Sequence, residues 1–231
     1  MTAPPQSQIE SLNTSLAELA RRYRPAPPLT DPLALIVWEN VGYLIPDDRR
    51  KALFDELAHR VGLEAAHLAE APEDILSDIA RRGGMRPAER AERLRRIGRL
   101  ALEAGGDFAS ALRVAGPAKA RKLLKRFPGI ADPGADKILL FSGLEARPAL
   151  DSNGVRAMVR LGHAAEGAAY AQAYRNATTA LLALGPPDQD RLMEAFQVLR
   201  AHGQALCKRA APLCLPCPLD PVCAHTATKM L

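Results

Sequence analysis

All four cysteines of the 231-residue chain lie in one short segment near its C-terminus, CKRAAPLCLPCPLDPVC. They are Cys207, Cys214, Cys217 and Cys223, spaced as C-x6-C-x2-C-x5-C. A secreted disulfide scaffold would distribute its cysteines along the chain, so this clustering indicates one metal centre. Zinc sites usually use two close cysteine pairs, whereas only the middle two cysteines form such a pair here. A compact loop of this kind fits a [4Fe-4S] cluster with one thiolate per iron; a zinc knot and incidental cysteines are the alternatives.

A second chemical feature is the stretch FPGIADPGADKILL, which carries the pairs Pro128-Gly129 and Pro133-Gly134 between helical segments. Proline and glycine break regular structure, so the stretch predicts a sharp double turn. A tight turn before a helix exposes backbone N–H groups that bind phosphate without reading base sequence. Gly129 permits the turn and lets a nucleic-acid backbone approach closely. The alternative is a plain turn between two helices.

Together, the cysteine spacing and the Pro-Gly stretch resemble the endonuclease III family of DNA glycosylases, which has a helix-hairpin-helix and a C-terminal [4Fe-4S] loop. The resemblance covers nearly the whole chain and implies an all-α fold in two lobes. Residues 31–145 would form a helical barrel with the helix-hairpin-helix at about 118–142. Residues 1–30 and 146–231 would form the iron–sulfur domain, with the cluster loop at 207–223. The implied function is base-excision repair on double-stranded DNA that holds a damaged or mismatched base.

The resemblance implies that the hairpin residues Pro128, Gly129, Ile130 and Ala131 contact DNA, although Ala131 replaces a second glycine of the family pattern. Family members that also cleave the DNA strand carry a nucleophilic lysine two residues after that glycine. Pro133 holds this position and has no amine, so we expect a monofunctional glycosylase with weak or absent lyase activity.

Lys137 is the nearby lysine. It would supply the amine only in the alternative of a bifunctional glycosylase and lyase; otherwise it is a structural or phosphate-facing residue. A second alternative is a non-catalytic relative that binds DNA structure. A redox or zinc module unrelated to DNA is the third.

Asp151, in the segment LDSNGVRAMVRLG, lies 23 residues after Pro128 at the start of a predicted helix. The family keeps a catalytic aspartate at this place. A carboxylate there stabilises an oxocarbenium-like sugar and activates the attacking water. Aspartate is also a preferred helix N-cap, and the two roles are compatible.

The segment LALIVWENVGYLIPDDRR is similar to the helix that lines the base pocket in the family. Glu39 and Tyr43 are four residues apart, which places them on one face of a helix. The resemblance implies that a buried Glu39 protonates the departing base and that Tyr43 fills the gap left by a flipped base. The alternatives are a surface glutamate and a packed tyrosine.

The formal net charge of +5 favours a polyanionic partner. Segment 81–99 holds eight arginines, of which Arg86 in GGMRPAER resembles a DNA-contacting loop residue of the family. Lys208 and Arg209 in the cysteine loop are candidate phosphate contacts, with ordinary solvated charge as the alternative. The chain has no apolar run long enough for a membrane span and no signal core. We therefore expect a monomeric, cytoplasmic, nucleoid-associated protein with no membrane partner.

These residues need a helical scaffold to position them. Aromatic residues make up only 4% of the chain, and alanine, leucine and arginine dominate it, which favours helices. No period-2 pattern predicts a strand. The predicted helices cover 7–23, 33–44, 46–61, 72–82, 86–104, 107–114, 118–126, the residues from the double turn to 142, 151–162, 167–184 and 188–206.

Overall fold

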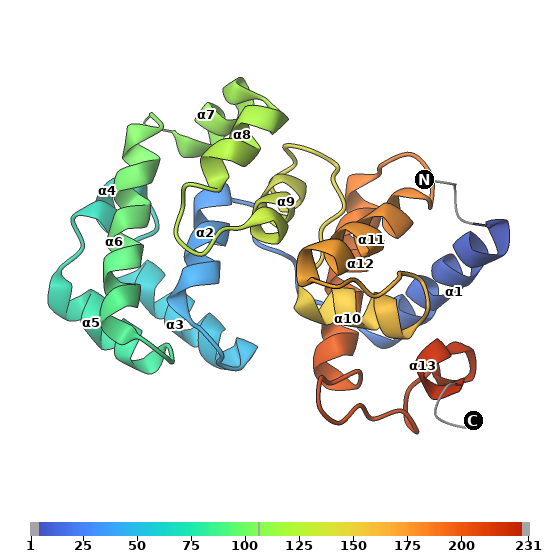
Figure 1. The fold of residues 1–231 in the computed structure, drawn as a ribbon. Helices are drawn as coiled ribbons and strands as arrows, with labels where there is room; N and C mark the ends of the chain where they lie inside the picture. The colour runs from blue at the N-terminus through green and yellow to red at the C-terminus, as the bar shows by residue number, and fades with distance from the viewer. Residues whose placement is uncertain (1–4, 106, 228–231) are drawn as a thin grey trace. The chain divides into compact units, whose positions relative to one another are not determined.

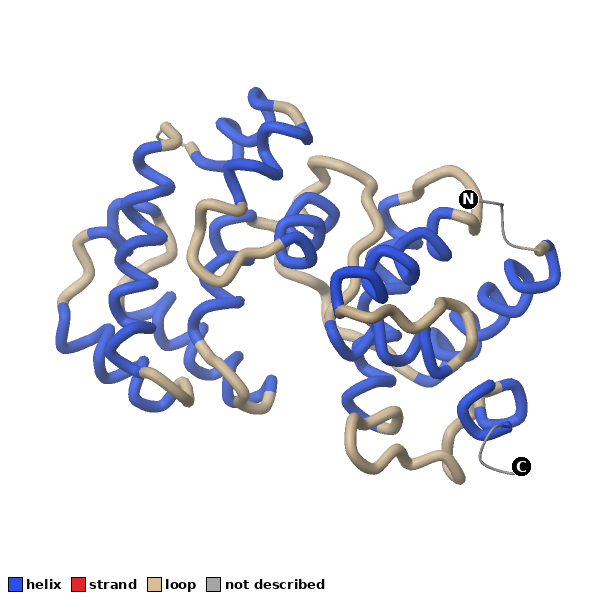
Figure 2. The backbone as a smooth tube through the Cα atoms, in the orientation of Figure 1, coloured by secondary structure: helices blue, strands red, loops and turns tan. Residues whose placement is uncertain are grey.

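The computed structural model describes residues 5–105 and 107–227. Within these ranges the backbone is built of helices and loops, as predicted, and no strand occurs (Figure 2). A single isolated β-bridge there joins Tyr43 to Gly84. No helix in the described part of the chain is long and apolar enough to cross a membrane.

The chain divides into two compact units, shown with their helix labels in Figure 1. We call Pro28–Glu145 the hairpin unit, and Met1–Pro27 together with Ala146–Leu231 the cysteine-loop unit. The hairpin unit contains α2 (Pro32–Val41), α3 (Asp47–Arg60), α4 (Ala65–Ala69), α5 (Glu73–Arg82), α6 (Pro87–Glu103), α7 (Phe108–Ala115), α8 (Pro117–Leu124) and α9 (Asp132–Phe141). The cysteine-loop unit contains α1 (Gln6–Arg22), α10 (Ser152–Arg160), α11 (Tyr170–Leu182), α12 (Gln189–Ala205), the 3-10 turn η1 (Asp220–Val222) and α13 (Ala224–Ala227).

Helix α2 is the central helix of the hairpin unit. Asp31 caps it by accepting the Ala34 N–H at 2.7 Å, and Pro32 occupies its first position, where a missing N–H costs nothing. Its sequence is almost entirely apolar, and most of its residues are buried. Trp38 packs edge-on against Phe54 of α3, with ring centres 5.6 Å apart. Functional side chains carried by α2 therefore rest on a fixed core.

Helices α10 and α12 pack closely in the cysteine-loop unit. A Cβ on Gly203 would lie 2.8 Å from the Asn153 carbonyl oxygen, so glycine permits the contact between these helices. Ser15 of α1 bonds to the buried His163 ring at 3.2 Å, which ties α1 to the loop after α10. The first turn of α10 is thus held from α12, and its far end is held from α1.

Two local predictions differ from the structure. Helix α2 ends at Val41, not at residue 44, because Gly42 is extended and the Tyr43 N–H donates to the Gly83 carbonyl instead of continuing the helix. The pair Pro133-Gly134 is not a second turn: it lies in the first turn of α9, where proline fits without losing a hydrogen bond. The five-residue α4 was not predicted, since it is too short to give a periodic signal.

Candidate functional site

The first Pro-Gly pair forms a β-turn. The Ile130 N–H donates to the Phe127 carbonyl at 3.2 Å, which places Pro128 and Gly129 at the central positions. Gly129 has a φ of +73°, the left-handed value that a type II turn requires at its second central residue. Ile130 is buried and anchors the turn, whereas Gly129 is exposed. The first-turn N–H groups of α9 follow directly, and backbone donors of this kind suit an anion such as phosphate.

No sequence pattern singles out Asn40, yet this side chain holds the hairpin in place. Asn40 is only 5% exposed on α2. Its Nδ2 donates to the Ile36 carbonyl and to the Pro128 carbonyl, both at 2.9 Å. Its Oδ1 would lie 3.2 Å from a Cβ on Gly129. The Asn40 amide therefore links the hairpin to α2, and a side chain larger than that of glycine at position 129 would come into close contact with this amide.

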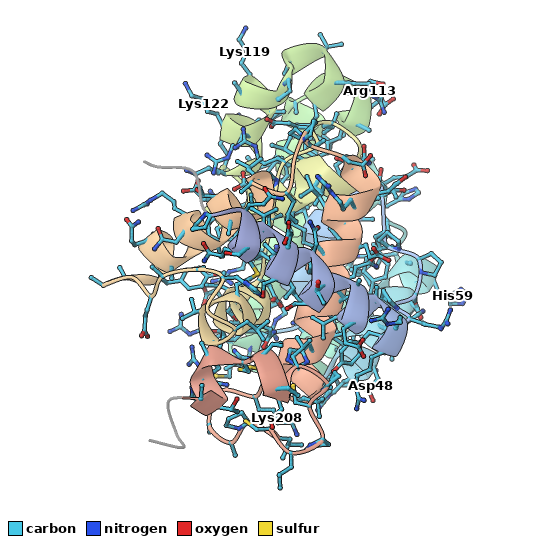
Figure 3. The ribbon with its side chains drawn as sticks, turned by 90° about the vertical axis from the view of Figure 1, so that its right-hand side faces the viewer. Asp48, His59, Arg113, Lys119, Lys122 and Lys208 are labelled. Carbon is cyan, nitrogen blue, oxygen red and sulfur yellow. The ribbon has the colours of Figure 1, made fainter. Side chains whose placement is uncertain are left out.

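An ion-pair network joins the two helices that flank the hairpin. Arg121 of α8 donates from Nε to Asp136 of α9 at 2.6 Å, and the Asp136 side chain is 5% exposed. Asp132, the first residue of α9, pairs with Lys125 at 2.6 Å and with Arg121 at 3.0 Å. The Lys125 ammonium lowers the pKa of the Asp132 carboxyl, followed by the weaker effect of Arg121. These basic residues stabilise the helix-hairpin-helix, while Lys119 and Lys122 extend outward from α8 (Figure 3).

The structure brings Glu39 and Lys137 together within the hairpin unit. The Lys137 Nζ donates to Glu39 Oε1 at 2.7 Å, with the side chains 13% and 29% exposed respectively. The ammonium also lies 5.8 Å from the centre of the Phe141 ring. A carboxylate in an ion pair carries no proton to donate, and a protonated amine is not a nucleophile. Pro133 lies in the first turn of the same helix as Lys137.

Tyr43 lies on a loop, so it does not share a helical face with Glu39. A Cβ on Gly84 would lie 2.2 Å from the Tyr43 carbonyl oxygen, so the loops carrying Tyr43 and Gly84 approach each other as closely as glycine allows. The bridge between them fixes the Tyr43 backbone, while the residue as a whole stays 58% exposed.

The two bridged loops present an exposed apolar tip, formed by Tyr43, Leu44 and Met85. These three residues are 58%, 75% and 58% exposed. Leu44 and Arg86 both have a φ of +55°, an uncommon value for residues other than glycine. The buried Arg90 side chain donates to the Met85 carbonyl and holds the loop from beneath. Strain maintained by such contacts is typical of functional loops, although no sequence signal identified Leu44 or Met85.

Asp151 caps α10 and also keeps an accessible carboxylate. Its Oδ1 accepts the N–H groups of Asn153 at 2.9 Å and Gly154 at 2.8 Å. Its Oδ2 accepts from the Asn153 amide at 2.9 Å and forms an ion pair with Arg200 Nε of α12 at 3.2 Å. The side chain is nevertheless 25% exposed. Asp151 is thus a rigid anion at the positive end of a helix, within reach of a ligand.

Two arginines of α10 hold the cysteine loop. Arg156 Nε donates to the Cys207 carbonyl at 2.9 Å. Arg160 donates to the carbonyls of Lys208 at 2.7 Å and Arg209 at 3.0 Å, and one of its nitrogens lies 3.5 Å from Cys207 Sγ. The side chains of Lys208 and Arg209 remain exposed, and Figure 3 labels Lys208 on this loop. The helix capped by Asp151 therefore also supports the cysteine loop.

The four cysteines are unpaired thiols of intermediate exposure, and all four line one pocket with His202. The Cys217 Sγ lies 3.9 Å from His202 Nε2, and burial raises the pKa of the Cys217 thiol. Among the described residues, no three histidine, cysteine or carboxylate side chains are arranged to hold a single metal ion. Ligands of one zinc ion must meet at one atom, whereas each thiolate of a [4Fe-4S] cluster binds its own iron. Four thiols that line one pocket are compatible with such a cluster.

Much of the arginine-rich segment is structural. Arg82 pairs with Glu56 of α3 at 2.7 Å, and hydrogen bonds from Arg82 and then Arg60 lower the pKa of Glu56 to about 2. Arg95 pairs with Glu73 at 2.6 Å. Arg86 differs, since its side chain is 76% exposed and makes a long 3.4 Å contact with a neighbouring glutamate.

Comparisons with known proteins give a fold but no close relative. No protein-family model matches the chain, and no curated protein matches it. The solved structures that it resembles include a trapped endonuclease III–DNA covalent intermediate in an estranged-adenine complex, with a TM-score of 0.74, 16% identity, and coverage of 96% of this chain and 99% of that chain. A non-covalent endonuclease III–DNA complex has a TM-score of 0.75 and 16% identity, with coverage of 96% of this chain and 98% of that chain. A thermostable thymine-DNA glycosylase has a TM-score of 0.76 and 16% identity, again with coverage of 96% of this chain and 98% of that chain. The chain therefore has the all-helical fold of these DNA glycosylases.

Proposed function

We propose that this protein is a base-excision DNA glycosylase that hydrolyses the N-glycosidic bond of a damaged or mismatched base and leaves an abasic site. The observation that carries the proposal is the Asp151 carboxylate, held by two backbone N–H groups, an amide and a guanidinium at the head of α10, in a chain with a DNA glycosylase fold. Such an enzyme works on chromosomal DNA, so we propose an intracellular, nucleoid-associated monomer.

Asp151 would act on the sugar. As the bond between C1′ and the base breaks, positive charge develops on the sugar ring, and a fixed carboxylate stabilises it without reorganising. Because both Asp151 oxygens already accept hydrogen bonds, we assign it chiefly an electrostatic role, with water activation as the secondary one.

DNA contacts would come from backbone donors, basic side chains and the apolar tip. Hairpin residues 128–131 would lie against one phosphate, with the N–H groups of Gly129 and Ala131 as donors, because Pro128 has no N–H and the Ile130 N–H closes the turn. Arg86, Lys208 and Arg209 are exposed cations for other phosphates. Tyr43 stands in an exposed apolar tip, as a residue that replaces a flipped base in the stack must.

We further propose that the enzyme is monofunctional. Strand cleavage through a Schiff base needs an unprotonated amine. Proline stands at the position of the family's lysine, and Lys137 is engaged by Glu39. Borohydride trapping on abasic-site DNA tests this: little covalent adduct is expected. A strong adduct that disappears in Lys137→Ala would establish the bifunctional alternative instead.

The four cysteines would hold a [4Fe-4S] cluster. When bound, the cluster crosslinks the loop that carries Lys208 and Arg209, and base removal uses no electron from it. We expect brown protein with about four irons and four sulfides per chain. Colourless protein that contains zinc would establish a zinc knot.

A non-catalytic DNA-structure binder is the second candidate, favoured by the altered hairpin with Ala131 and Pro133. A panel of duplexes, each with one lesion or mismatch, separates the two when it is analysed with and without alkali. A monofunctional glycosylase yields strand breaks only after alkali. Tight binding to abasic-site duplex without base release from any duplex would establish the binder.

A further inference from the structure

Both candidate catalytic carboxylates form ion pairs with cationic side chains. In the cysteine-loop unit, Asp151 forms an ion pair with Arg200 Nε at 3.2 Å, and Arg200 also donates to Gln204 of the same helix at 3.0 Å. In the hairpin unit, Glu39 pairs with Lys137 at 2.7 Å. The Arg200 and Asp151 side chains are only 23% and 25% exposed, so solvent screens this pair less than it screens a surface pair.

This pairing matters for the charge that the reaction creates. A neutral base such as uracil takes the C1′–N bonding pair with it, so it leaves as an anion unless an acid protonates it. The sugar becomes a cation at the same moment. Such a reaction needs an acid near the base and uncompensated negative charge near the sugar. A carboxylate beside a guanidinium supplies less of that negative charge, because the two fields partly cancel.

Resting on the proposed function, we propose that the preferred substrates are purines that carry a positive charge because a ring nitrogen is alkylated. In such a base the C1′–N9 bond breaks, and its electron pair goes to N9 and neutralises the purinium ring. The base leaves as a neutral molecule, and the positive charge passes to the sugar. Water then adds at C1′ and releases one proton to solvent. The net charge stays constant through bond cleavage, so no general acid is required.

Arg200 is the positioning residue that sets this preference. Its guanidinium contacts Oδ2 of the Asp151 carboxylate, whereas the backbone donors contact Oδ1, and it offsets part of the carboxylate charge. Removing the guanidinium leaves the N-cap hydrogen bonds to Asn153 and Gly154 in place. The carboxylate would then offer more negative charge to a developing oxocarbenium ion, which benefits neutral bases most.

The test compares single-turnover base release from duplexes of one sequence that carry 7-methylguanine, uracil or thymine glycol at one position. We expect 7-methylguanine to leave at least roughly a hundredfold faster than either neutral base. In Arg200→Met, the ratio of 7-methylguanine to uracil release should fall by roughly tenfold or more. Arg175→Met is the matched control, because the Arg175 guanidinium donates to the neutral Gln172 side chain at 2.6 Å rather than to a carboxylate.

Faster release of uracil or thymine glycol than of 7-methylguanine would overturn the substrate class while leaving the glycosylase function intact. An unchanged ratio in Arg200→Met would overturn the role of Arg200. If that variant does not fold, the selectivity of the unmodified protein still decides the substrate class. No release from any duplex would refute the glycosylase function itself, and the substrate class with it.

Discussion

Replacing Asn40 with alanine tests whether one buried amide holds the hairpin that we propose binds DNA. Asn40 is 5% exposed and donates to the Ile36 and Pro128 carbonyls at 2.9 Å each. The Ile36 carbonyl lies within α2, whereas the Pro128 carbonyl belongs to the turn. Leaving a buried acceptor without its donor costs about 1–3 kcal/mol. Alanine regains about 0.5 kcal/mol through its higher helix propensity.

We therefore expect Asn40→Ala to lower the free energy of unfolding of the hairpin unit by about 1–2 kcal/mol. Hydrogen exchange of the buried α2 and α9 amides measures this change. Affinity for abasic-site duplex should fall about five- to tenfold, because the released turn must be ordered again on binding. Binding is followed by titration at several salt concentrations.

Two controls separate the lost donor from other effects. Asn40→Asp keeps the shape but cannot donate when ionised, so it should destabilise at least as much as alanine. Asn176→Ala removes an amide of intermediate exposure that donates to the Ala165 carbonyl at 3.0 Å and accepts from Gln172 at 2.8 Å. Because both hydrogen bonds are exposed to solvent, this change should alter stability by less than about 0.5 kcal/mol. The reasoning is refuted if Asn40→Asp leaves both stability and DNA affinity unchanged.

Three further predictions follow from the two units. Gly129→Ala should lower the free energy of unfolding by about 1–2 kcal/mol, because the φ of Gly129 is +73°. Gly134→Ala should raise it by up to about 1 kcal/mol, since Gly134 lies in α9 and an added Cβ would meet no side chain closer than 3.5 Å. Thermal unfolding that ranks the two variants in the opposite order contradicts the turn assignment. Burial lowers the pKa of His163, so the protein should lose stability as pH falls below 6.5. Urea titrations of His163→Asn should show less of this loss, and an unchanged pH dependence would exclude His163 as its cause. Arg160→Met should loosen the cysteine loop and reduce the iron retained per chain, and full retention after dialysis would show that the loop needs no support from α10.

Local patterns in the sequence accounted for most helices. Asp31 and Asp107 are N-caps where a polar residue precedes an apolar run, and Gly129 forms the turn that the first Pro-Gly pair predicts. The second pair was misinterpreted because proline is compatible with the first turn of a helix as well as with a break. Which of the two occurs at Pro133 depends on how α9 packs, and this is not a local property.

The contacts around the candidate site were beyond local patterns. Asn40 meets Pro128 across 88 residues, and Lys137 meets Glu39 across 98. Each pair is made by the packing of α2 against the hairpin helices. The ending of α2 before Tyr43 likewise results from a bridge to a distant loop. The residue types suggested chemistry, but only the fold shows which charges neutralise one another.

The most direct test of the central claim is base release by Asp151→Asn beside the unmodified protein, on the duplex that the unmodified protein cleaves best after alkali. Asparagine is as good an N-cap as aspartate, so the change removes the charge and leaves the cap of α10 in place. We predict that release falls by at least roughly a hundredfold while the Kd for abasic-site duplex stays within about threefold. Near-normal release by Asp151→Asn would contradict the account.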